Sequence, residues 1–325
     1  MPTAAQRGIP ALELIDAELA YGRRVLWSGL DLAVRPGEFV AVLGANGSGK
    51  TSLVRAVLGE QPLTRGEIRI CGEPAHRGSN RVGYVPQRVT IDSSMMIKAR
   101  DVVQLGIDGH RWGPGLALGA RRRRLRAKVD GLLESVGATA FAQAPVSMLS
   151  GGELQRIRVA EALAGDPELL LCDEPLAALD LGRQREVASL VDEQRRRSNT
   201  AVLFITHEIN AVLDYVDRVL YLAGGRFRLG TPDEVMNSAS LTELYGAPVD
   251  VVKAHGRVVV VAANDMMAGI HQSLDDHALH DPDLHDHGWH DPHQHWAGPG
   301  TGGGPRPGAR ADPAPQARSE QRTPR

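Results

Sequence analysis

The stretch GANGSGKT, at residues 44–51, constrains the fold of this chain more than any other. It matches the pattern G-x-x-x-x-G-K-[ST], in which glycines allow the backbone to curl around a phosphate with its N–H groups turned inward. The apolar run FVAVLG, at 39–44, precedes it and has the form of a buried parallel strand. The run TSLVRAVLG continues from it with apolar residues at helical spacing, and a helix beginning near Lys50 would direct its positive end at the same phosphate. A chance glycine-rich turn, the alternative, does not account for a strand before the pattern and a helix after it.

This pattern predicts a site for the phosphates of a nucleotide. Lys50 would supply a cation to the β- and γ-phosphates, and Thr51 would supply a hydroxyl group to Mg²⁺. The residues expected to contact the nucleotide are Gly44, Ala45, Asn46, Gly47, Ser48, Gly49, Lys50, Thr51 and Ser52. Two acids, Asp173 and Glu174, follow a second apolar run, LLLC. An aspartate there can hold Mg²⁺ through a water molecule, and the adjacent glutamate can polarise an attacking water as the general base.

Apolar runs that resemble buried strands alternate with helical stretches along the chain. PELLLCDEP at 167–175 and AVLFITHE at 201–208 predict two further strands, and the alternation indicates an α/β fold with a mainly parallel sheet, a P-loop NTPase core. Residues from about 90 to 160 are mostly helical in pattern and predict a helical subdomain inserted into this core. Two antiparallel β hairpins are expected near the end, with turns at Gly224-Gly225 and His255-Gly256.

Composition excludes several classes of protein. The 325 residues carry a formal net charge of −2, so nothing in the overall charge favours a nucleic-acid partner. The two cysteines, Cys71 and Cys172, are too few for a disulfide framework and fit a reducing compartment. No apolar run reaches the roughly 18–20 residues of a membrane span, and no signal peptide is expected. The basic run GARRRRLRAK, at 119–128, predicts a solvated helix face, with contact to a partner subunit or to anionic lipid headgroups as the alternative.

Three parts are expected along the chain: a flexible leader at 1–11, one domain at 12–263, and a disordered tail at 264–325. Residues 297–325 are rich in Gly, Pro, Ala and Arg and offer little apolar surface to bury. Before them, His and Asp recur from 271 to 296 without Lys or Arg, and imidazole ligands suit Zn²⁺ better than Mn²⁺. A weak, multi-site zinc binder and a solvated tail without a metal role are both open. The zinc candidates are His285, His287, His290, His293 and His295.

The stretch LSGGELQR, at 149–156, narrows the class. Together with the phosphate pattern and CDEPLAALD it resembles the ATP-binding subunits of ABC transporters, over about residues 12–262. The resemblance implies that two copies enclose two ATP molecules, with Ser150, Gly151 and Gly152 of one copy capping the γ-phosphate held by the other. The family usually has glutamine where this chain has Glu153, which would place an acid near that interface and change turnover.

Four more positions take their expected roles from the same resemblance. Tyr21 matches an aromatic residue that stacks on adenine, with an ordinary surface tyrosine as the alternative. Gln87 matches the glutamine that senses Mg²⁺ and the transmembrane partner, and Asp180 matches a residue that crosses the dimer interface. His207 matches a switch histidine that contacts the γ-phosphate. With Glu174, the residues Gln87 and His207 are the expected catalytic group.

Two stretches, RVGYVPQR and the segment from YVDRVLYLAGG to LTELYGAPVDVV, resemble the zinc/manganese branch of ABC importers. This implies an ATPase that drives import of a divalent transition metal, zinc before manganese, from the cytoplasmic face of the membrane. Expected partners are transmembrane permease subunits, a solute-binding protein and a second copy of the chain, but no nucleic acid. A different cargo is one alternative. A soluble ABC ATPase acting on DNA or ribosomes is another, although such proteins typically carry two cassettes or long coiled coils.

Overall fold

The computed structural model describes residues 8–87, 96–108, 119–177, 179–254 and 256–262. Its central sheet has the strand order β10-β9-β3-β8-β7-β6, and neighbouring strands are parallel except for the antiparallel edge strand β10. The three strands predicted from apolar runs are adjacent here, which confirms the α/β fold with a mainly parallel sheet. The strands are β3 (Phe39–Gly44), β6 (Val82–Val85), β7 (Leu169–Asp173), β8 (Ala201–Ile205), β9 (Arg218–Ala223) and β10 (Arg226–Gly230).

The central sheet is buried on both faces along β3, β7 and β8, which explains why these three strands are continuous apolar runs. Along β3, Val40 and Val42 belong to one apolar cluster, whereas Phe39, Ala41 and Leu43 belong to the other. The strand therefore contributes alternate side chains to two separate cores, as the period of two residues requires.

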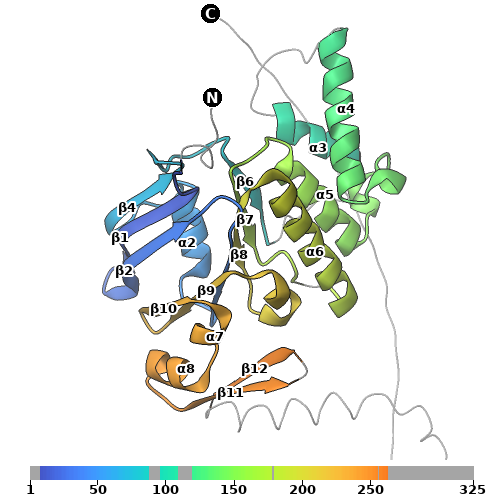
Figure 1. The fold of residues 1–325 in the computed structure, drawn as a ribbon. Coiled ribbons are helices and arrows are strands. Elements are labelled where there is room, and N and C mark those ends of the chain that lie inside the picture. Colours follow the sequence, from blue (N-terminus) through green and yellow to red (C-terminus); the bar gives the residue numbers. More distant parts are fainter. Residues whose placement is uncertain (1–7, 88–95, 109–118, 178, 255, 263–325) are drawn as a thin grey trace, which may run out of the picture. The chain divides into compact units, whose positions relative to one another are not determined.

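The first core lies between the central sheet and a second, antiparallel sheet. That sheet has the order β2-β1-β4-β5, and α2 (Lys50–Val57) lies between the two sheets (Figure 1). Trp27 of β2 is fully buried in this core. The sequence patterns predicted α2 but not this sheet. Its strands are β1 (Leu12–Tyr21), β2 (Arg24–Val34), β4 (Arg65–Ile70) and β5 (Glu73–Pro74).

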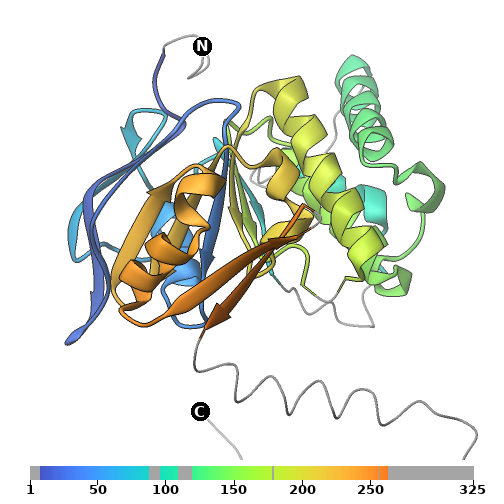
Figure 2. The same cartoon turned by 60° about the horizontal axis from the view of Figure 1, so that its bottom comes forward.

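Helices cover the other face of the central sheet. Those between β6 and β7 form the predicted helical insertion, and α6 (Leu181–Ser198) follows β7 (Figures 1 and 2). On α4, Val129 and Leu133 are buried, whereas the arginines of its first turns, Arg121 to Arg124, are exposed. The insertion comprises α3 (Ala99–Asp108), α4 (Ala120–Ser135), the short 3₁₀ turns η1 (Thr139–Phe141) and η2 (Val146–Met148), and α5 (Gly151–Leu163).

The end of the described chain carries the two predicted hairpins. β9 and β10 are joined at Gly224-Gly225, where φ values of 56° and 81° are those of a type I′ turn. The second hairpin pairs β11 (Val249–Ala254) with β12 (Arg257–Ala262), and His255 of its predicted turn lies outside the described residues. Between and before them lie η3 (Ile209–Ala211), η4 (Leu213–Tyr215), α7 (Pro232–Val235) and α8 (Ser238–Tyr245).

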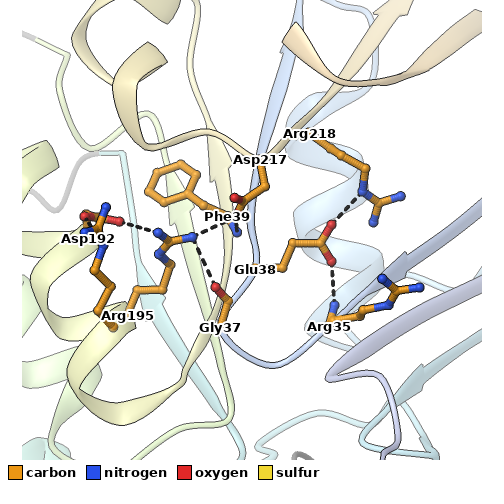
Figure 3. Close-up of polar contacts among 9 residues, drawn as sticks. Arg35, Gly37, Glu38, Phe39, Asp192, Arg195, Asp217 and Arg218 are labelled. Carbon is orange, nitrogen blue, oxygen red and sulfur yellow. Dashed lines mark hydrogen bonds and ion pairs between the residues drawn. The ribbon is translucent and has the colours of Figure 1, made fainter.

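An ionic network around the buried Arg195 fastens α6 to the beginning of the central strands (Figure 3). Arg195, only 8% exposed, donates to Asp217 over 2.7 Å and to the carbonyl oxygen of Gly37 over 3.1 Å, and it pairs with Asp192 over 2.7 Å. Asp217 also accepts the backbone N–H of Phe39 over 2.8 Å. Removing one partner of such a pair would leave a buried charge uncompensated, so the network fixes where α6 packs against β3.

Several predictions concern residues outside the described ranges. The tail at 264–325, with its predicted disorder and its zinc candidates, and the first seven residues of the leader lie there. Within the leader, Ala11 is fully buried and donates its N–H to the carbonyl oxygen of Val34. Cys71 and Cys172 are both buried and unpaired with each other. No helix among the described residues is both long and apolar enough to cross a membrane.

Candidate nucleotide site

A cavity of about 880 Å³ opens where β3 ends and α2 begins. It collects residues from five separate parts of the chain, because the carboxyl ends of β3, β6, β7 and β8 meet at this edge of the sheet and the β1–β2 connection adjoins it. Most of the predicted nucleotide residues are among those that line it. The lining residues are Tyr21, Arg24, Leu26, Gly44, Ala45, Asn46, Gly47, Gly49, Lys50, Thr51, Ser52, Gln87, Glu174 and His207.

The loop before α2 requires glycine at two places. Gly44 has φ 145°, and a Cβ there would lie 2.3 Å from the carbonyl oxygen of Leu222. Gly49 has φ 101°, and a Cβ there would lie 2.9 Å from Nε1 of Trp27. The glycines are therefore imposed by the packing of the loop against β9 and β2 as well as by its curvature. Ser48 of the same loop does not line the cavity, and its buried hydroxyl has no hydrogen-bond partner in the part of the chain that the structure describes.

Lys50 lies at the base of the cavity and is only 5% exposed. Its Nζ donates to the carbonyl oxygens of Gly44 over 2.6 Å and Ala45 over 3.1 Å. Burial lowers the pKa of Lys50, and the charges of Glu174 and Asp173 oppose that shift. The lysine is thus held at the loop by its backbone, with two carboxylates nearby that favour its charged form.

Tyr21 stands at the mouth of the cavity and is 52% exposed. Its hydroxyl donates to Oε1 of Gln61 over 2.7 Å and lies 3.5 Å from Oγ of Ser52. The hydroxyl is therefore anchored while half of the side chain remains free to contact a ligand, as stacking on adenine requires. Arg24, which the motifs did not indicate, also lines the cavity and donates to the carbonyl oxygen of Gly47 over 2.9 Å.

The two acids at the end of β7 lie in different environments. Asp173 is 3% exposed, and its Oδ1 has no hydrogen-bond partner among the described residues. Burial raises the pKa of Asp173, the neighbouring charge of Glu174 raises it further, and Lys50 opposes both. Glu174 has φ 46°, the left-handed region, and its backbone N–H donates to the carbonyl oxygen of Ile205. It lines the cavity, whereas Asp173 does not.

The three predicted catalytic residues meet at one oxygen atom. Nε2 of Gln87 donates to Oε2 of Glu174 over 2.7 Å, and Nδ1 of His207 lies 3.6 Å from the same oxygen. The side chain of Glu174 is 15% exposed, whereas that of His207 is 61% exposed. A carboxylate so placed, close to the phosphate loop and between an amide and an imidazole, can accept a proton from a water molecule in the cavity.

The predicted γ-phosphate caps are not brought to this cavity within one chain. Ser150 is the N-cap of α5, and Glu153 completes a capping box by accepting the backbone N–H of Ser150 over 2.8 Å. That hydrogen bond lowers the pKa of Glu153. Asp180 is the N-cap of α6 and accepts the backbone N–H of Arg183 over 3.0 Å. Gly151 and Gly152 begin α5. These residues thus have local structural roles that the motifs did not reveal.

The residues around Asp173 fit a magnesium ion. Its Oδ1 is a buried carboxylate oxygen without a hydrogen-bond partner within the described ranges, and Thr51 and Gln87 supply further oxygen atoms in the adjoining cavity. Oxygen ligands are the donor set that Mg²⁺ prefers. Away from this point, no group of three or more His, Cys, Asp or Glu side chains within the described ranges is placed to hold a metal ion. The five tail histidines lie outside those ranges.

Comparison with known proteins identifies the family of this chain. The family description "ABC transporter" matches residues 27–177. The zinc import ATP-binding protein ZnuC of Pseudomonas entomophila (strain L48) is 32% identical over 237 residues, which cover 72% of this chain and 83% of that protein. This chain belongs to the ABC transporter ATP-binding proteins. As an ABC ATPase it binds and hydrolyses ATP, and the cavity at the phosphate loop is its candidate ATP site.

Two further similarities extend over most of this ABC ATPase. The manganese transport system ATP-binding protein MntB of Bacillus subtilis (strain 168) is 31% identical over 245 residues, 74% of this chain and 95% of that protein. Among solved structures, a chain of an ABC transporter described as of the metal-chelate type, in an inward-facing conformation, is 27% identical with a TM-score of 0.65. The match covers 79% of this chain and 99% of that one.

Proposed function

We propose that this ABC ATPase energises the import of a divalent transition metal, zinc before manganese. The observation that carries the ATPase part is the meeting of Gln87, Glu174 and His207 at one carboxylate oxygen beside the phosphate loop. The metal cargo is supported by the relatives, which are named for zinc import and for manganese transport. The histidines from 271 to 296 favour zinc, because imidazole suits it better than manganese.

In this proposal the residues predicted for the site divide the work on ATP among them. The backbone of 44–50 and the ammonium of Lys50 hold the β- and γ-phosphates, and Tyr21 stacks on adenine. Thr51, Gln87 and Asp173 hold Mg²⁺, which neutralises phosphate charge when it is bound. Glu174 accepts the proton of the attacking water, and His207 contacts the γ-phosphate.

We further propose that two copies of the chain enclose ATP between them. Ser150 caps α5, and Gly151 and Gly152 form its first turn, where the helix dipole favours an anion, which in this arrangement is the γ-phosphate held by the partner copy. Asp180 would lie at the same interface. Transmembrane permease subunits would hold the pair at the cytoplasmic face of the membrane, and a solute-binding protein would deliver the metal ion to the permease.

The cargo is tested by growth of a deletion strain under metal limitation. Chelator should abolish growth, zinc should restore it at lower concentration than manganese, and the cloned chain should remove the requirement. A Lys50→Ala variant is the control, because it keeps the chain but lacks the cation that holds the phosphates. Equal growth with and without the gene under chelator would refute metal import and would favour an ABC transporter with a different cargo.

The zinc role of the tail needs a separate test. His285, His287, His290, His293 and His295 could bind zinc weakly at several sites and so buffer it or modulate the ATPase. Isothermal titration with Zn²⁺ should show heat with the full chain that is absent from a chain ending at Ala263. Identical titrations would leave the tail without a metal role, and would not affect the ATPase assignment.

A further inference from the structure

The backbone on either side of His207 is held by its neighbour Thr206, which is 2% exposed. The hydroxyl of Thr206 donates to the carbonyl oxygen of Glu208 over 3.1 Å and accepts the N–H of Glu208 over 3.0 Å. The N–H of Thr206 in turn donates to the carbonyl oxygen of Val42 in β3. The loop that carries His207 is therefore closed on itself and fixed to the strand that leads into the phosphate loop.

The next link is between Glu208 and Asn210. Oε1 of Glu208 accepts the backbone N–H of Asn210 over 3.2 Å and its side-chain Nδ2 over 2.8 Å. This carboxylate therefore cannot shift without breaking two hydrogen bonds to one residue. The side chain of Asn210 is half-buried at η3, which begins directly after the loop.

Asn210 is also hydrogen-bonded to the hairpin of β11 and β12. Its Nδ2 donates to the carbonyl oxygen of Val258 over 3.0 Å, and its Oδ1 accepts the N–H of Val258 over 2.8 Å. Val258 is paired with Lys253 across the hairpin, one position beyond the closing pair, where backbone groups point away from the partner strand. The side-chain amide of Asn210 thus forms the two hydrogen bonds to Val258 that β11 does not form. A residue of a neighbouring strand would pair with Val258 in the same way.

We infer that Asn210 is a positioning residue for ATP hydrolysis, because it couples β12 to the loop of His207. The chain of contacts runs from Val258 through Asn210 and Glu208 to the peptide groups around His207. No part of this path lines the ATP cavity except His207 itself. The inference rests on the proposed role of His207, and it assigns the hairpin a part in setting that histidine's position relative to Glu174.

The test measures kcat and KM for ATP with the full-length chain. Asn210→Asp keeps the size of the side chain but turns its donor to Val258 and Glu208 into a second acceptor, so the path is broken. We expect kcat to fall about tenfold, because small misplacements of catalytic groups are costly, and KM to stay within about twofold of the wild-type value. If Asn210→Asp does not fold, as judged by thermal denaturation, Asn210→Ser replaces it in the same assay.

Thr242→Val is the matched control. The hydroxyl of Thr242 accepts the N–H of Val249 over 3.0 Å and donates to its carbonyl oxygen, so it anchors the same hairpin at β11 without contact to the loop of His207. This variant should lose stability to a similar extent and keep kcat within about twofold. An equal loss of kcat in Thr242→Val would show that Asn210 matters only as an anchor of the hairpin, and would overturn the inference.

A double-mutant cycle with His207→Ala tests whether Asn210 affects kcat through His207. If Asn210 acts through His207, then Asn210→Asp in the His207→Ala background should lower kcat by less than about twofold further. A full tenfold loss in that background, or an unchanged kcat in Asn210→Asp alone, would refute the coupling while leaving the role of His207 intact. Wild-type kcat in His207→Ala alone would instead remove the proposed role of His207, and the inference with it.

Discussion

Replacing Asp173 with asparagine should stabilise the free protein while abolishing its stabilisation by magnesium and ATP. The wild-type carboxylate is 3% exposed, its Oδ1 has no partner among the described residues, and Glu174 adds a second negative charge beside it. Asparagine has nearly the same shape and no charge. A buried polar group without a hydrogen bond costs about 1–3 kcal/mol of stability. Asparagine removes the charge but still buries an amide, so we expect the free energy of unfolding to rise by only about 1 kcal/mol. For a domain of this size that raises Tm by about 2–4 °C.

The stability effect of Asp173 should depend on pH, and the direction of its pKa shift gives the sign. The pKa of Asp173 is raised in the folded state, so between the unfolded value and the folded value the native protein binds more protons. The contribution of Asp173 to stability is therefore fully present below the unfolded pKa and is lost as pH rises through the folded pKa. The Tm advantage of Asp173→Asn should be small at acidic pH, where the wild-type carboxylate is protonated, and should grow as pH rises through the folded pKa.

Thermal denaturation with and without ligand completes the experiment. Saturation at about a hundred times Kd stabilises a protein by about 2.7 kcal/mol, so magnesium and ATP should raise the wild-type Tm well above that of Asp173→Asn. The order of the two Tm values is thus expected to reverse on adding ligand. A variant less stable than wild type at pH 7 without ligand would refute the argument that Asp173 is strained by burial, and equal ligand shifts would refute its role in holding Mg²⁺.

Three other changes probe the site. Glu174→Gln keeps the shape of the side chain but cannot accept a proton, so kcat should fall about a hundredfold or more and an ATP-bound dimer should accumulate in gel filtration; continued fast hydrolysis would exclude Glu174 as the base. Tyr21→Ala should raise KM for ATP about tenfold, whereas Tyr21→Phe, which keeps the ring, should not; similar KM values would rule out stacking. Glu153→Gln keeps the capping box without its negative charge and should lower KM for ATP. Glu153→Ala also removes the capping box and should lower Tm as well. An unchanged KM in Glu153→Gln would show that the charge of Glu153 has no role in ATP binding.

The sequence predicted those parts of the fold whose pattern is local. β3 coincides with FVAVLG because both faces of the central sheet are covered and a continuous apolar run results. The hairpin at Gly224-Gly225 was predictable because both turn residues need positive φ, which glycine provides. The sheet of β1, β2 and β4 was not predicted. Its pairing shifts register between Leu14 and Ala17, so alternation is interrupted where a strand would otherwise be recognised.

The site shows the same limit. Gln87, Glu174 and His207 lie far apart in the sequence, and only the motifs that contain them predicted that they act together. Arg24 and Gln61 belong to no such motif, and their contacts to Gly47 and Tyr21 follow from the way β1, β2 and α2 pack. Local sequence could have indicated the capping box of Ser150 and Glu153, since a serine followed three residues later by an acid before a helix is its pattern.

The backbone conformation of Glu174 is energetically costly, and it also determines where the two acids of the site lie. A non-glycine residue at φ 46° is strained by about 1–3 kcal/mol, and the surrounding structure must impose it. Here the N–H of Glu174 is held by the carbonyl oxygen of Ile205, where β8 ends, so the backbone turns directly after β7. The turn lets consecutive acids take different environments, with Asp173 buried and Glu174 at the cavity between Gln87 and His207. If both carboxylates serve one nucleotide, as we propose, this turn is what gives each its own environment, and the strained backbone of Glu174 is the cost of that arrangement.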